Sequence, residues 1–590
     1  MCGIAGWFGN SAGLEVSSLR AALQHRGPDG SGVWSDPAGR TALVHTRLAI
    51  LDLTDAGAQP MVYGAETESG KPSAVLVFNG EIYNFRELRR ELEAVGESFL
   101  GHSDSEVLLR LLVREGRAAL PKLAGMFAFA FWDVASGRAL LARDAFGIKP
   151  LYFSTRDGGV QFASEVNALR GESAPTVDAT AMRDFLLWGS VLEPSTLFNE
   201  VRQIPAGGFL EWDGGHLKAG QWFKPKFIHG KAPRDPVATT RAALVDSIER
   251  HLVSDVPVGI FLSGGIDSTA VLALARKALG PAADIRTFSI GFHSPEYDES
   301  SVARRTAERF GANHTEWMMT AEDGVAEIPH YLAAMDQPGI DGFNTWCVSK
   351  LARREGMKVV LSGLGGDELF SGYDSFRQVP RFRQAHRLPG PLRKLFSMLL
   401  NRSAEGSRWR RLAAFLQGPG AALAAFHAQR GIFTESEARK LTLALANVDP
   451  GPANWEVDGL PDDPRDAVSF LELTRYMGNQ LLRDSDVYSM AHGLELRVPF
   501  VDLKLFEAIA GIPSATRLRQ GKRLLLEAVP EIPSEVANAP KRGFRFPFQD
   551  WLATSFGAQF QAAAENLPVA SPQWYKKWCL FVLRRAIAGH

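Results

Sequence analysis

The sequence is poor in cysteine and has no long apolar run. Its 590 residues include three cysteines, Cys2, Cys347 and Cys579. So few cysteines exclude a disulfide-rich secreted scaffold, and no CxxC pair suggests a zinc site. The longest apolar run, residues 123–132, is far shorter than the ~20 residues of a transmembrane helix. We therefore expect a protein of a reducing compartment without a transmembrane segment.

The sequence also lacks an excess of either charge. It has 65 Lys and Arg against 66 Asp and Glu, which gives a formal net charge of -1. Apolar residues make up 45% and charged residues 22%, as in an ordinary globular protein. This composition excludes a mainly disordered chain and a histone-like binder of nucleic acid. The first residues, MCGIAGWFGN, lack the basic start of a secretory signal, so we expect a cytoplasmic protein.

The pattern of elements changes along the chain. At ~150 residues per domain the length allows two to four domains. The first ~165 residues indicate packed sheets with two helices, and Phe127, Phe129 and Phe131 alternate with alanine as in a strand buried on both faces. From ~237 strands alternate with helices, which indicates a parallel sheet covered on both faces, and beyond ~376 the chain looks helical. We predict an α+β domain over residues 1–210 and an α/β parallel-sheet domain with a helical C-terminal part over 211–590.

The position of Cys2 gives a first candidate for catalysis. An initiator methionine before a small residue is commonly removed, which would leave Cys2 with a free α-amine. The ordinary pKa of such an amine, ~8, is close to that of a thiol, ~8.5. The amine can therefore take the thiol's proton, so that one residue supplies nucleophile and base. On position alone, a buried cysteine in a first strand remains the alternative.

Six ordered segments within the first ~165 residues are CGIAGWFG, QHRGPDGSG, HTRLAILDL, FNGEIYN, SDSEV and GMFAFAFWD. Together they resemble the glutamine amidotransferase domain of the N-terminal-nucleophile type, an α+β sandwich. The resemblance implies that Cys2 attacks glutamine. The residues that it implies for binding glutamine are Arg47, Asn79, Gly80, Glu81 and Asp104.

Each of these roles has a physical basis. The fork of Arg47 can pair with the α-carboxylate of glutamine, and Glu81 and Asp104 can hold its α-ammonium group. The Asn79 amide and the Gly80 N–H can stabilise the oxyanion of the tetrahedral intermediate. Taken singly, Asn79-Gly80 could be only a hairpin turn and Asp104 only a carboxylate at a helix N-terminus. The combination favours the functional interpretation.

The second half of the chain contains a Gly-rich loop, VGIFLSGGIDS, at residues 258–268. An apolar strand runs into a turn and then a helix, so the N–H groups near Gly264 and Gly265 can face an anion beside the positive end of the helix dipole. The pattern is not a Walker loop, because GxxxxGK[ST] is absent. Gly-rich turns between a strand and a helix are common, so this loop alone is weak evidence.

Further segments make the loop specific. SGGIDS resembles the pyrophosphate loop of ATP pyrophosphatases that adenylate a carboxylate, and VVLSGLGGDELFSGY, FSIGF, GLELRVPF and PKRGF follow it. Together they resemble the synthetase domain of the asparagine synthetase family, in which a glutaminase domain comes first. The resemblance spans nearly the whole chain. It implies that the protein uses ATP and Mg²⁺ to adenylate a carboxylate and joins it to ammonia from glutamine, most simply converting aspartate to asparagine.

The resemblance also implies the residues of this second site. Those for ATP are Leu262 (or its neighbour Phe261), Ser263, Gly265, Asp267, Ser268, Ile290, Ser362 and Gly363. Those for Mg²⁺ are Asp267 and Asp367, whose hard oxygens suit that ion. Lys541 would neutralise charge on the α-phosphate and on the tetrahedral adduct. On the acceptor side the resemblance implies Leu364, Asp486 and Glu495, although Glu495 with Arg497 could instead cap a junction between a strand and a turn.

One position departs from the family pattern. Asparagine-forming members have an acidic residue where this chain has Leu364. The acceptor therefore stays open between aspartate and another carboxylate, for example a uronic acid of a surface polysaccharide. A non-catalytic regulatory relative is a third alternative. The intact Cys2, Arg47, Asp267, Asp367 and Lys541 argue against it.

A local excess of positive charge lies between residues 377 and 411, which contain ten Lys or Arg and one acid, Glu405. The segment is either a solvated helical face or a docking surface for an acidic acceptor or a membrane-associated assembly. Few aromatic residues are interleaved, so we expect no nucleic-acid partner. The expected partners are small substrates, namely glutamine, ATP and a carboxylate. Ammonia must pass internally between the two sites, and the sequence locates no path for it and leaves a homodimer open.

Overall fold

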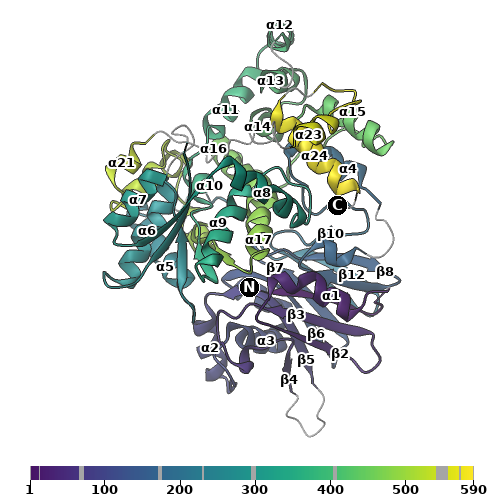
Figure 1. Ribbon diagram of the computed structural model, residues 1–590, viewed down its shortest axis with the longest axis vertical. Coiled ribbons are helices and arrows are strands. Elements are labelled where there is room, and N and C mark those ends of the chain that lie inside the picture. Colours follow the sequence, from purple (N-terminus) through teal and green to yellow (C-terminus); the bar gives the residue numbers. More distant parts are fainter. Residues whose placement is uncertain are drawn as a thin grey trace.

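The structure is a computed structural model, and it describes residues 2–11, 13–64, 72–170, 176–228, 232–293, 300–402, 408–539, 556–570 and 573–588. The N-terminal part of the chain, drawn in purple and blue, lies at the lower end of the molecule (Figure 1). The rest of the chain, in teal, green and yellow, lies above it. The division along the chain is therefore also a division in space.

The N-terminal part is built on two antiparallel sheets of six strands each. The strands of the first sheet, in spatial order, are β10 (Arg202–Gln203), β8 (Tyr152–Arg156), β9 (Gly159–Ala163), β1 (Gly3–Phe8), β3 (Thr41–Arg47) and β2 (Gly30–Ser35). The strands of the second are β12 (His216–Gln221), β11 (Gly208–Asp213), β7 (Arg138–Arg143), β6 (Gly125–Asp133), β5 (Ala74–Ile82) and β4 (Met61–Tyr63). Because β1 pairs on both edges, Cys2 is held at the end of a central strand.

Helices cover the outer faces of both sheets. Helix α1 (Val16–Leu23) packs on the first sheet, and α2 (Phe85–Ala94) and α3 (Asp104–Glu115) pack on the second. The Ser103 hydroxyl accepts a hydrogen bond from the Glu106 N–H (3.2 Å) and so caps α3. This cap fixes Asp104 as the first residue of the helix.

The two faces of β6 pack against different parts of the domain. Phe127, Phe129 and Phe131 pack in the cluster that also contains the apolar side chains of α2 and α3. The alternate residues, Ala128 and Ala130, lie in the cluster between the two sheets. Large rings fill the space below the helices, whereas small methyl groups let the sheets approach each other. The prediction of a strand buried on both faces is confirmed.

The N-terminal part extends beyond the predicted division at residue 210. That residue lies inside β11, which pairs with β12 from Gly208 opposite Gln221 to Asp213 opposite His216. A division at residue 210 would separate two paired strands. We therefore propose that the first domain ends after Gln221.

The second part of the chain contains a sheet of five parallel strands. In spatial order they are β15 (Asn313–Met319), β14 (Arg286–Phe292), β13 (Val258–Phe261), β16 (Val359–Leu361) and β17 (Glu495–Arg497). The chain adds β14 and β15 on one side of β13, and β16 and β17 on the other. In parallel sheets, ligands bind beyond the carboxyl ends of the strands where the order reverses, which here is between β13 and β16.

Helices flank this sheet, as the predicted alternation requires. They are α5 (Pro236–His251), α6 (Ile266–Leu279), α7 (Ser300–Arg309), α8 (Ala321–Ala333), α9 (Phe343–Arg354), α17 (Leu482–Met490) and α18 (Leu503–Ile509). Right-handed crossovers place the helices before and after the reversal on opposite faces of the sheet. Residues 268–275 of α6 are buried, which matches a helix that packs directly on a sheet.

The remaining described helices make the C-terminal part mainly helical, as predicted. They are α10 (Gly366–Phe370), α11 (Ser375–His386), α12 (Gly390–Asn401), α13 (Arg408–Gln417), α14 (Ala422–Arg430), α15 (Glu435–Ala446), α16 (Pro464–Leu471), α19 (Ser514–Arg517), α20 (Arg523–Ala528), α21 (Ser534–Ala537), α23 (Gly557–Ala562) and α24 (Trp574–Ala588), with a π-helical segment over Glu472–Leu481. They pack partly on α4 (Ala179–Trp188) of the N-terminal part. Among the described helices, none is long and apolar enough to cross a membrane. The predicted fold class, an α+β sandwich followed by a parallel α/β sheet and a helical end, is confirmed.

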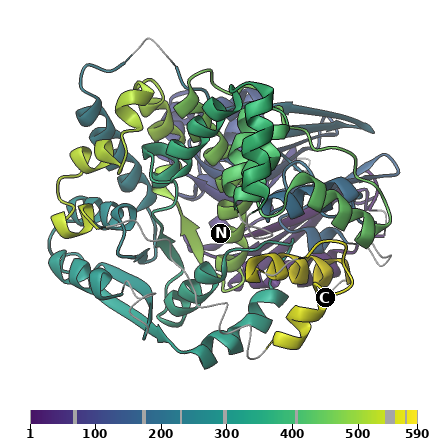
Figure 2. The ribbon, with the colours of Figure 1, turned by 90° about the horizontal axis from the view of Figure 1, so that it is seen from above.

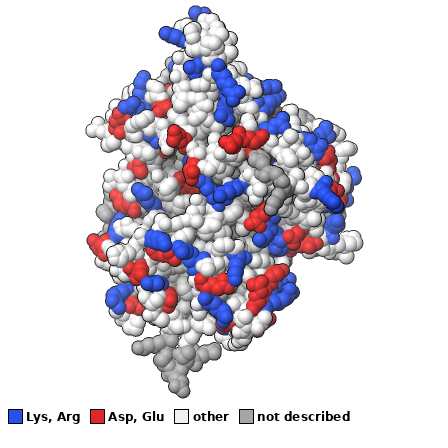
Figure 3. Space-filling model, turned by 180° about the vertical axis from the view of Figure 1, so that it is seen from behind, with Lys and Arg blue, Asp and Glu red and all other residues white. Residues whose placement is uncertain are grey.

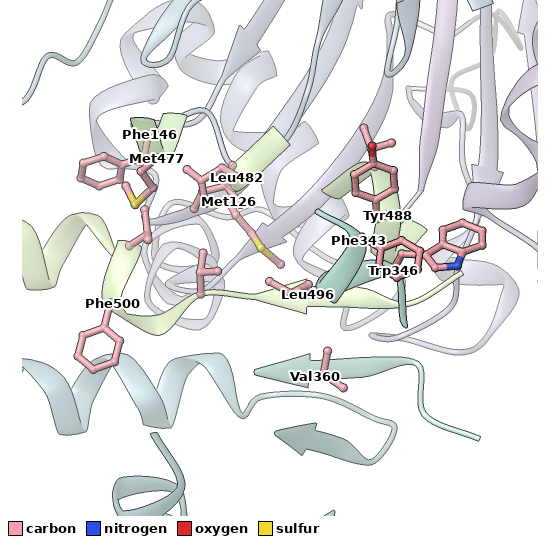
Figure 4. Close-up of a cluster of buried hydrophobic side chains, with 14 of the residues drawn as sticks. Met126, Phe146, Phe343, Trp346, Val360, Met477, Leu482, Tyr488, Leu496 and Phe500 are labelled. Atoms are coloured by element: carbon pink, nitrogen blue, oxygen red, sulfur yellow. The ribbon is translucent and has the colours of Figure 1, made fainter. Parts of the chain in front are cut away.

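The two parts of the chain share a hydrophobic core. Met126 and Phe146 of the N-terminal part lie in the same buried cluster as Leu482, Leu496 and Phe500 of the second part (Figure 4). The Phe146 ring also meets the Phe506 ring edge to face, with centroids 5.6 Å apart. Apolar packing of this kind stabilises one arrangement of the two parts rather than a loose tether.

Candidate active site

Cys2 and Asn79 lie together although they belong to different sheets. The Cys2 N–H donates a hydrogen bond to Asn79 Oδ1 (3.0 Å), and the Arg26 Nε–H donates to the Cys2 carbonyl (3.3 Å). Cys2 is 8% exposed, and burial raises the pKa of its thiol. The thiol therefore stays protonated until a base takes its proton. Two residues that the sequence assigned to one site are thus in direct contact.

The Asn79 side chain has one hydrogen-bond donor that the described part of the chain does not use. Its Oδ1 accepts from Cys2, whereas its buried Nδ2 makes no hydrogen bond within the described part of the chain. Such a group is costly unless it serves a ligand. At Gly80, which has φ of +154°, a Cβ would collide with the Met126 carbonyl, so only glycine fits there. A free amide donor beside a nucleophile is suited to hold an oxyanion.

Arg47, at the end of β3, is held by main-chain carbonyls. Its guanidinium donates hydrogen bonds to the Thr54 carbonyl (3.0 Å) and to the Asp52 carbonyl (2.5 Å). Of the acidic side chains that the structure describes, none forms an ion pair with Arg47. Its positive charge is therefore oriented but not neutralised, as binding of a substrate carboxylate requires.

Glu81 and Asp104 are two buried acids with strongly perturbed pKa values. Burial raises the pKa of Asp104 to about 6 and that of Glu81 well above its usual range, and the charge of Asp104 adds to the shift of Glu81. Asp104 Oδ2 accepts a hydrogen bond from the Ile82 N–H (2.8 Å). Buried acids of this kind gain a favourable partner when a cation such as an α-ammonium group arrives.

The cation that already contacts Glu81 comes from the other part of the chain. Nη2 of Arg497, in β17, lies 3.0 Å from Glu81 Oε1, and Arg497 Nε donates to Glu495 Oε1 (2.5 Å). Burial acts to raise the pKa of Glu495, but nearby positive charges, including Arg497 and Lys149, hold it at about 2. A buried guanidinium thus joins the N-terminal part to the edge of the parallel sheet.

A second buried ion cluster crosses the same boundary. Arg26 forms ion pairs with Glu165 (2.9 Å) and with Asp486 of α17 (2.6 Å). Lys149 lies 3.5 Å from Asp486, and His25 lies 2.9 Å from Glu165. Because Arg26 also donates a hydrogen bond to the Cys2 carbonyl, this cluster links Cys2 to α17.

The Gly-rich loop and its partner loop meet at the carboxyl ends of β13 and β16. The Ser268 hydroxyl accepts from the Ser263 N–H (3.1 Å), and the Gly265 N–H donates to Ser263 Oγ (3.2 Å). A Cβ on Gly363 would lie 2.8 Å from the Ser268 nitrogen, so the two loops touch. The Ser362 N–H donates to the Arg497 carbonyl (2.8 Å). The loops therefore occupy the crevice where the strand order reverses.

Comparisons with known proteins agree with this two-part layout. The family described as asparagine synthase matches residues 239–577, and the family described as glutamine amidotransferase domain matches residues 1–223. The chain is 33% identical to "Asparagine synthetase [glutamine-hydrolyzing] 1" of Bacillus subtilis over 94% of this chain and 88% of that protein. The chain belongs to the asparagine synthase family. It is a glutamine amidotransferase of the asparagine synthase type, and the family implies that it uses ATP.

Two other proteins to which the chain is similar carry different names. A putative glutamine-hydrolysing asparagine synthetase of Mycobacterium tuberculosis is 33% identical over 93% of this chain and 86% of that protein. "Amidase chry2" of Gibberella zeae is 26% identical over 91% of this chain and 85% of its own length. Similarity at this level fixes the family and leaves the acceptor substrate to be determined.

Lys522 of the synthase domain is a site residue that the sequence reasoning missed. Its Nζ forms ion pairs with Asp267, at the start of α6, and with Asp367 Oδ1 (2.5 Å), at the start of α10. Burial acts to lower the pKa of Lys522, but the two carboxylates outweigh it and raise the pKa. Lys522 has a positive φ of 56° and follows Gly521, which also has a positive φ. In the sequence, only the glycine before Lys522 hints at this turn.

The two aspartates fit a divalent cation. Both carboxylates converge on one ammonium group, and Gly366 and Gly372 leave room for them, because a Cβ at either glycine would collide with a carboxylate oxygen. Within the described residues, no group of three or more His, Cys, Asp and Glu could hold a metal by itself. Mg²⁺ commonly takes one or two carboxylates and completes its shell with phosphate oxygens and water. Asp267 and Asp367 match that mode.

The remaining predicted residues fall into three groups. Leu262 and Ile290, at the ends of β13 and β14, are buried, at 2% and 5% exposed, and Leu364 is half-buried against the apolar core. Asp486 pairs with Arg26 of the glutaminase domain, and the charge of Glu495 acts on the pKa of Glu81 across the boundary. The acceptor-side role of both residues stays a prediction. Lys541 lies outside the described residues. The sequence did not predict roles for Arg26 and Arg497, because the residues that they pair with across the boundary are distant in the sequence.

Proposed function

We propose that this protein is a glutamine-dependent amide synthetase that adenylates the side-chain carboxylate of L-aspartate and joins it to ammonia, forming L-asparagine, AMP and pyrophosphate. The observation that carries the proposal is the placement of Arg497. Its guanidinium contacts Glu81 of the glutamine site, and its carbonyl accepts from Ser362 of the nucleotide loop. The two half-reactions therefore share one structural element.

The glutaminase half of the reaction begins at Cys2. After removal of the initiator methionine, the nitrogen that contacts Asn79 Oδ1 becomes an α-amine, which takes the proton of the thiol. The thiolate attacks the amide carbon of glutamine, and the Asn79 amide donates to the oxyanion. As this intermediate collapses, the α-ammonium group of Cys2 returns its proton to the leaving nitrogen. Ammonia departs and a thioester remains, which water cleaves to glutamate. Arg47, Glu81 and Asp104 hold the two charged groups of glutamine.

Ammonia must then reach the synthetase half without being protonated. The boundary between the domains offers apolar packing from Met126, Leu482 and Leu496 (Figure 4). Neutral ammonia can pass such a layer, whereas moving ammonium into it would cost the free energy of desolvating a full charge. This packing supports a path through the domain boundary.

In the synthetase half, the acceptor carboxylate attacks the α-phosphorus of ATP and displaces pyrophosphate. The N–H groups and hydroxyls of residues 263–268 bind the leaving pyrophosphate, and Lys522 contributes its charge. Mg²⁺, when bound by Asp267 and Asp367, would neutralise phosphate charge. Lys541 is proposed to stabilise the developing negative charge on the acyl adenylate and its tetrahedral adduct. Ammonia attacks the acyl carbon, AMP leaves, and the new amide loses its extra proton.

Leu364 supports a second candidate acceptor. It follows Ser362 and Gly363 directly and packs against apolar residues, where asparagine-forming relatives have an acid. A leucine can neither accept a proton nor bind an α-ammonium group. The same chemistry on a different carboxylate, such as a uronic acid, is therefore the second candidate.

Release of pyrophosphate with glutamine and ATP across a panel of carboxylates tests both candidates. Aspartate-dependent pyrophosphate with an equal amount of asparagine is the expected result. Release that ignores aspartate but responds to a uronic acid would contradict the first candidate and support the second. If no carboxylate stimulates release, both acceptor proposals are wrong.

A further inference from the structure

Helix α12 (Gly390–Asn401) stands at the end of the molecule farthest from the glutaminase domain (Figure 1). Viewed from above, the green helices of this region lie in front of the rest of the chain (Figure 2). Of the twelve residues of α12, only Ser397 is buried. The helix is therefore held by few contacts and offers most of its surface to the surroundings.

The exposed side of α12 is apolar, which reverses the usual arrangement. Leu392, Leu395, Phe396 and Leu399 are between 43% and 51% exposed. Their spacing of i, i+3, i+4 and i+7 places them on one stripe of the helix. The opposite side contains Ser397, whose hydroxyl donates to the Ala413 carbonyl of α13 (3.0 Å). A surface helix normally turns its apolar stripe inward, so this stripe lacks a partner among the described residues.

The apolar residues are concentrated and do not reflect a generally apolar surface. Seven of the 17 large apolar residues that are exposed in the described chain lie between residues 388 and 409. Besides the four stripe residues they are Leu388, Met398 and Trp409. We call these seven residues the tip patch. A cluster of this kind marks an interaction surface, whereas single exposed apolar residues are ordinary.

Within the described part of residues 375–434, the charged residues that flank the tip patch are basic. Arg387, Lys394, Arg402 and Arg408 are exposed around it. From residue 375 to 434 the sequence contains one acid, Glu405, which lies outside the described residues. In Figure 3 the uppermost part of the molecule is white and blue, and red atoms appear lower down. The complementary surface must therefore be both apolar and negatively charged.

We propose that the tip patch docks on an anionic lipid bilayer, with the apolar stripe of α12 inserted at the boundary between headgroups and acyl chains. Helices that lie in this boundary have an apolar face bordered by Lys and Arg, and anionic headgroups attract the basic residues. A second copy of this chain meeting the same patch would bring basic surfaces together. The bilayer satisfies both features at once.

Docking in this way has a geometric consequence. The glutaminase domain lies at the opposite end of the molecule, so it would face away from the membrane (Figure 1). Helix α11 (Ser375–His386) leads from α12 back toward α10, which carries Asp367 of the nucleotide site. The synthetase site would then lie on the membrane side of the glutamine site. This inference does not depend on which carboxylate is the acceptor.

Sedimentation of the full-length protein with lipid vesicles tests the proposal. One set contains phosphatidylcholine alone and the other contains about 30% phosphatidylglycerol as the anionic lipid. We expect at least about tenfold tighter binding to the anionic vesicles. The double variant Leu395→Glu, Phe396→Glu should lose at least about tenfold of that affinity, because two charges would enter the apolar layer.

The variants come with matched controls. Leu100→Glu with Leu279→Glu adds the same two charges at exposed leucines far from the tip and should bind vesicles as the unmodified protein does. Glutaminase activity and melting temperature report whether each variant is folded, and both should stay unchanged. Lys394→Glu should weaken anionic binding selectively.

Three results would overturn the proposal. One is no binding of the unmodified protein to anionic vesicles. Another is equal binding by the tip double variant and the control double variant. The third is a concentration-dependent dimer in light scattering that the tip double variant abolishes while vesicle binding is unaffected, which would assign the patch to a second copy of the chain.

Discussion

The buried acids of the proposed glutamine site and of the proposed nucleotide site differ in which domain supplies their positively charged partner. At the proposed nucleotide site, Asp267 and Asp367 both pair with Lys522 of the same domain. At the proposed glutamine site, Glu81 pairs with Arg497, which belongs to the other domain. The aspartates of the proposed nucleotide site thus pair within one domain, whereas Glu81 of the proposed glutamine site pairs across the domain boundary. The comparison teaches that glutamine use, more than ATP use, should depend on the domain boundary.

The largest expected effect separates the two sites outright. Cys2→Ala removes the nucleophile, so glutamine-driven amide synthesis should fall at least about 1,000-fold. Synthesis from added ammonium salts should stay within about twofold, because the nucleotide site contains no part of Cys2. Parallel assays of amide and pyrophosphate measure both. Glutamine-driven synthesis by the variant would show that Cys2 is not the nucleophile.

The next effect should fall on the nucleotide site alone. Lys522→Met leaves two carboxylates close together without their ammonium partner, which should lower the free energy of unfolding by about 3 kcal/mol. Pyrophosphate release should fall about 100-fold with glutamine and with ammonia alike, while glutamine hydrolysis persists.

Thermal unfolding with and without Mg²⁺ sharpens this test. Added Mg²⁺ should raise the melting temperature of Lys522→Met more than that of the unmodified protein, because the metal replaces the missing positive charge. Lys522→Arg, which keeps the charge, should show the smaller metal effect. A variant with unchanged pyrophosphate release would contradict the role given to Lys522.

The boundary itself is tested at Arg497. Arg497→Met removes the buried partner of Glu81 and Glu495, and we expect a loss of about 3 kcal/mol in stability. The KM for glutamine should rise about tenfold or more, while the kinetics with ammonia change less. Arg497→Lys keeps the positive charge, so its stability and its KM for glutamine should lie between those of Arg497→Met and those of the unmodified protein.

Steady-state kinetics with the two nitrogen donors measures this difference. Equal losses with glutamine and ammonia in the folded Arg497→Met variant would contradict the dependence of the glutamine site on the boundary. The two sites would then differ in their chemistry but not in how far they depend on the domain boundary.

The smallest effect concerns pH. Because burial raises the pKa of Asp104 to about 6, the carboxylate that should hold the α-ammonium of glutamine becomes protonated below that pH. Glutaminase kcat/KM should therefore fall by up to about tenfold per pH unit below pH 6. In Asp104→Asn the value should be low throughout and this dependence should disappear. A profile in Asp104→Asn that matches the unmodified protein would contradict the assignment.

The raised pKa of Asp104 also makes the stability of the protein depend on pH. The folded state binds the Asp104 proton more tightly than the unfolded state, so this group's contribution to stability is present at low pH and is lost as pH rises from 3.8 to about 6. Unfolding measurements on Asp104→Asn and the unmodified protein across this range should converge at low pH. The stability and kinetic effects of Asp104 therefore run in opposite directions.

Much of the fold followed from local patterns. The alternation of phenylalanine and alanine in residues 127–131 predicted a doubly buried strand, and the alternating strands and helices after ~237 predicted the parallel sheet. The division at residue 210 fell inside β11, because the pairing of β11 with β12 is not visible in either strand by itself. Local composition gives elements and leaves their partners undetermined.

The candidate site divides in the same way. Cys2 and Asn79 were assigned to one site by ordered motifs, and they are in contact. Lys522, Arg26 and Arg497 were missed, because each acts through partners far away in the sequence. Such pairs carry no fixed spacing, so a single sequence offers no pattern that reveals them.

The sequence by itself determined the family and predicted few disulfides, and it supplied Cys2 as a candidate nucleophile and the Gly-rich loop as a candidate for binding pyrophosphate. Each of these can be recognised from short stretches of the sequence. The tertiary structure decided that the Arg497 guanidinium of the second domain contacts Glu81 of the first, and that α12 turns its apolar stripe outward. These depend on which surfaces meet when the chain is folded. Burial and pairing across long separations set the pKa values and contacts that composition alone leaves free.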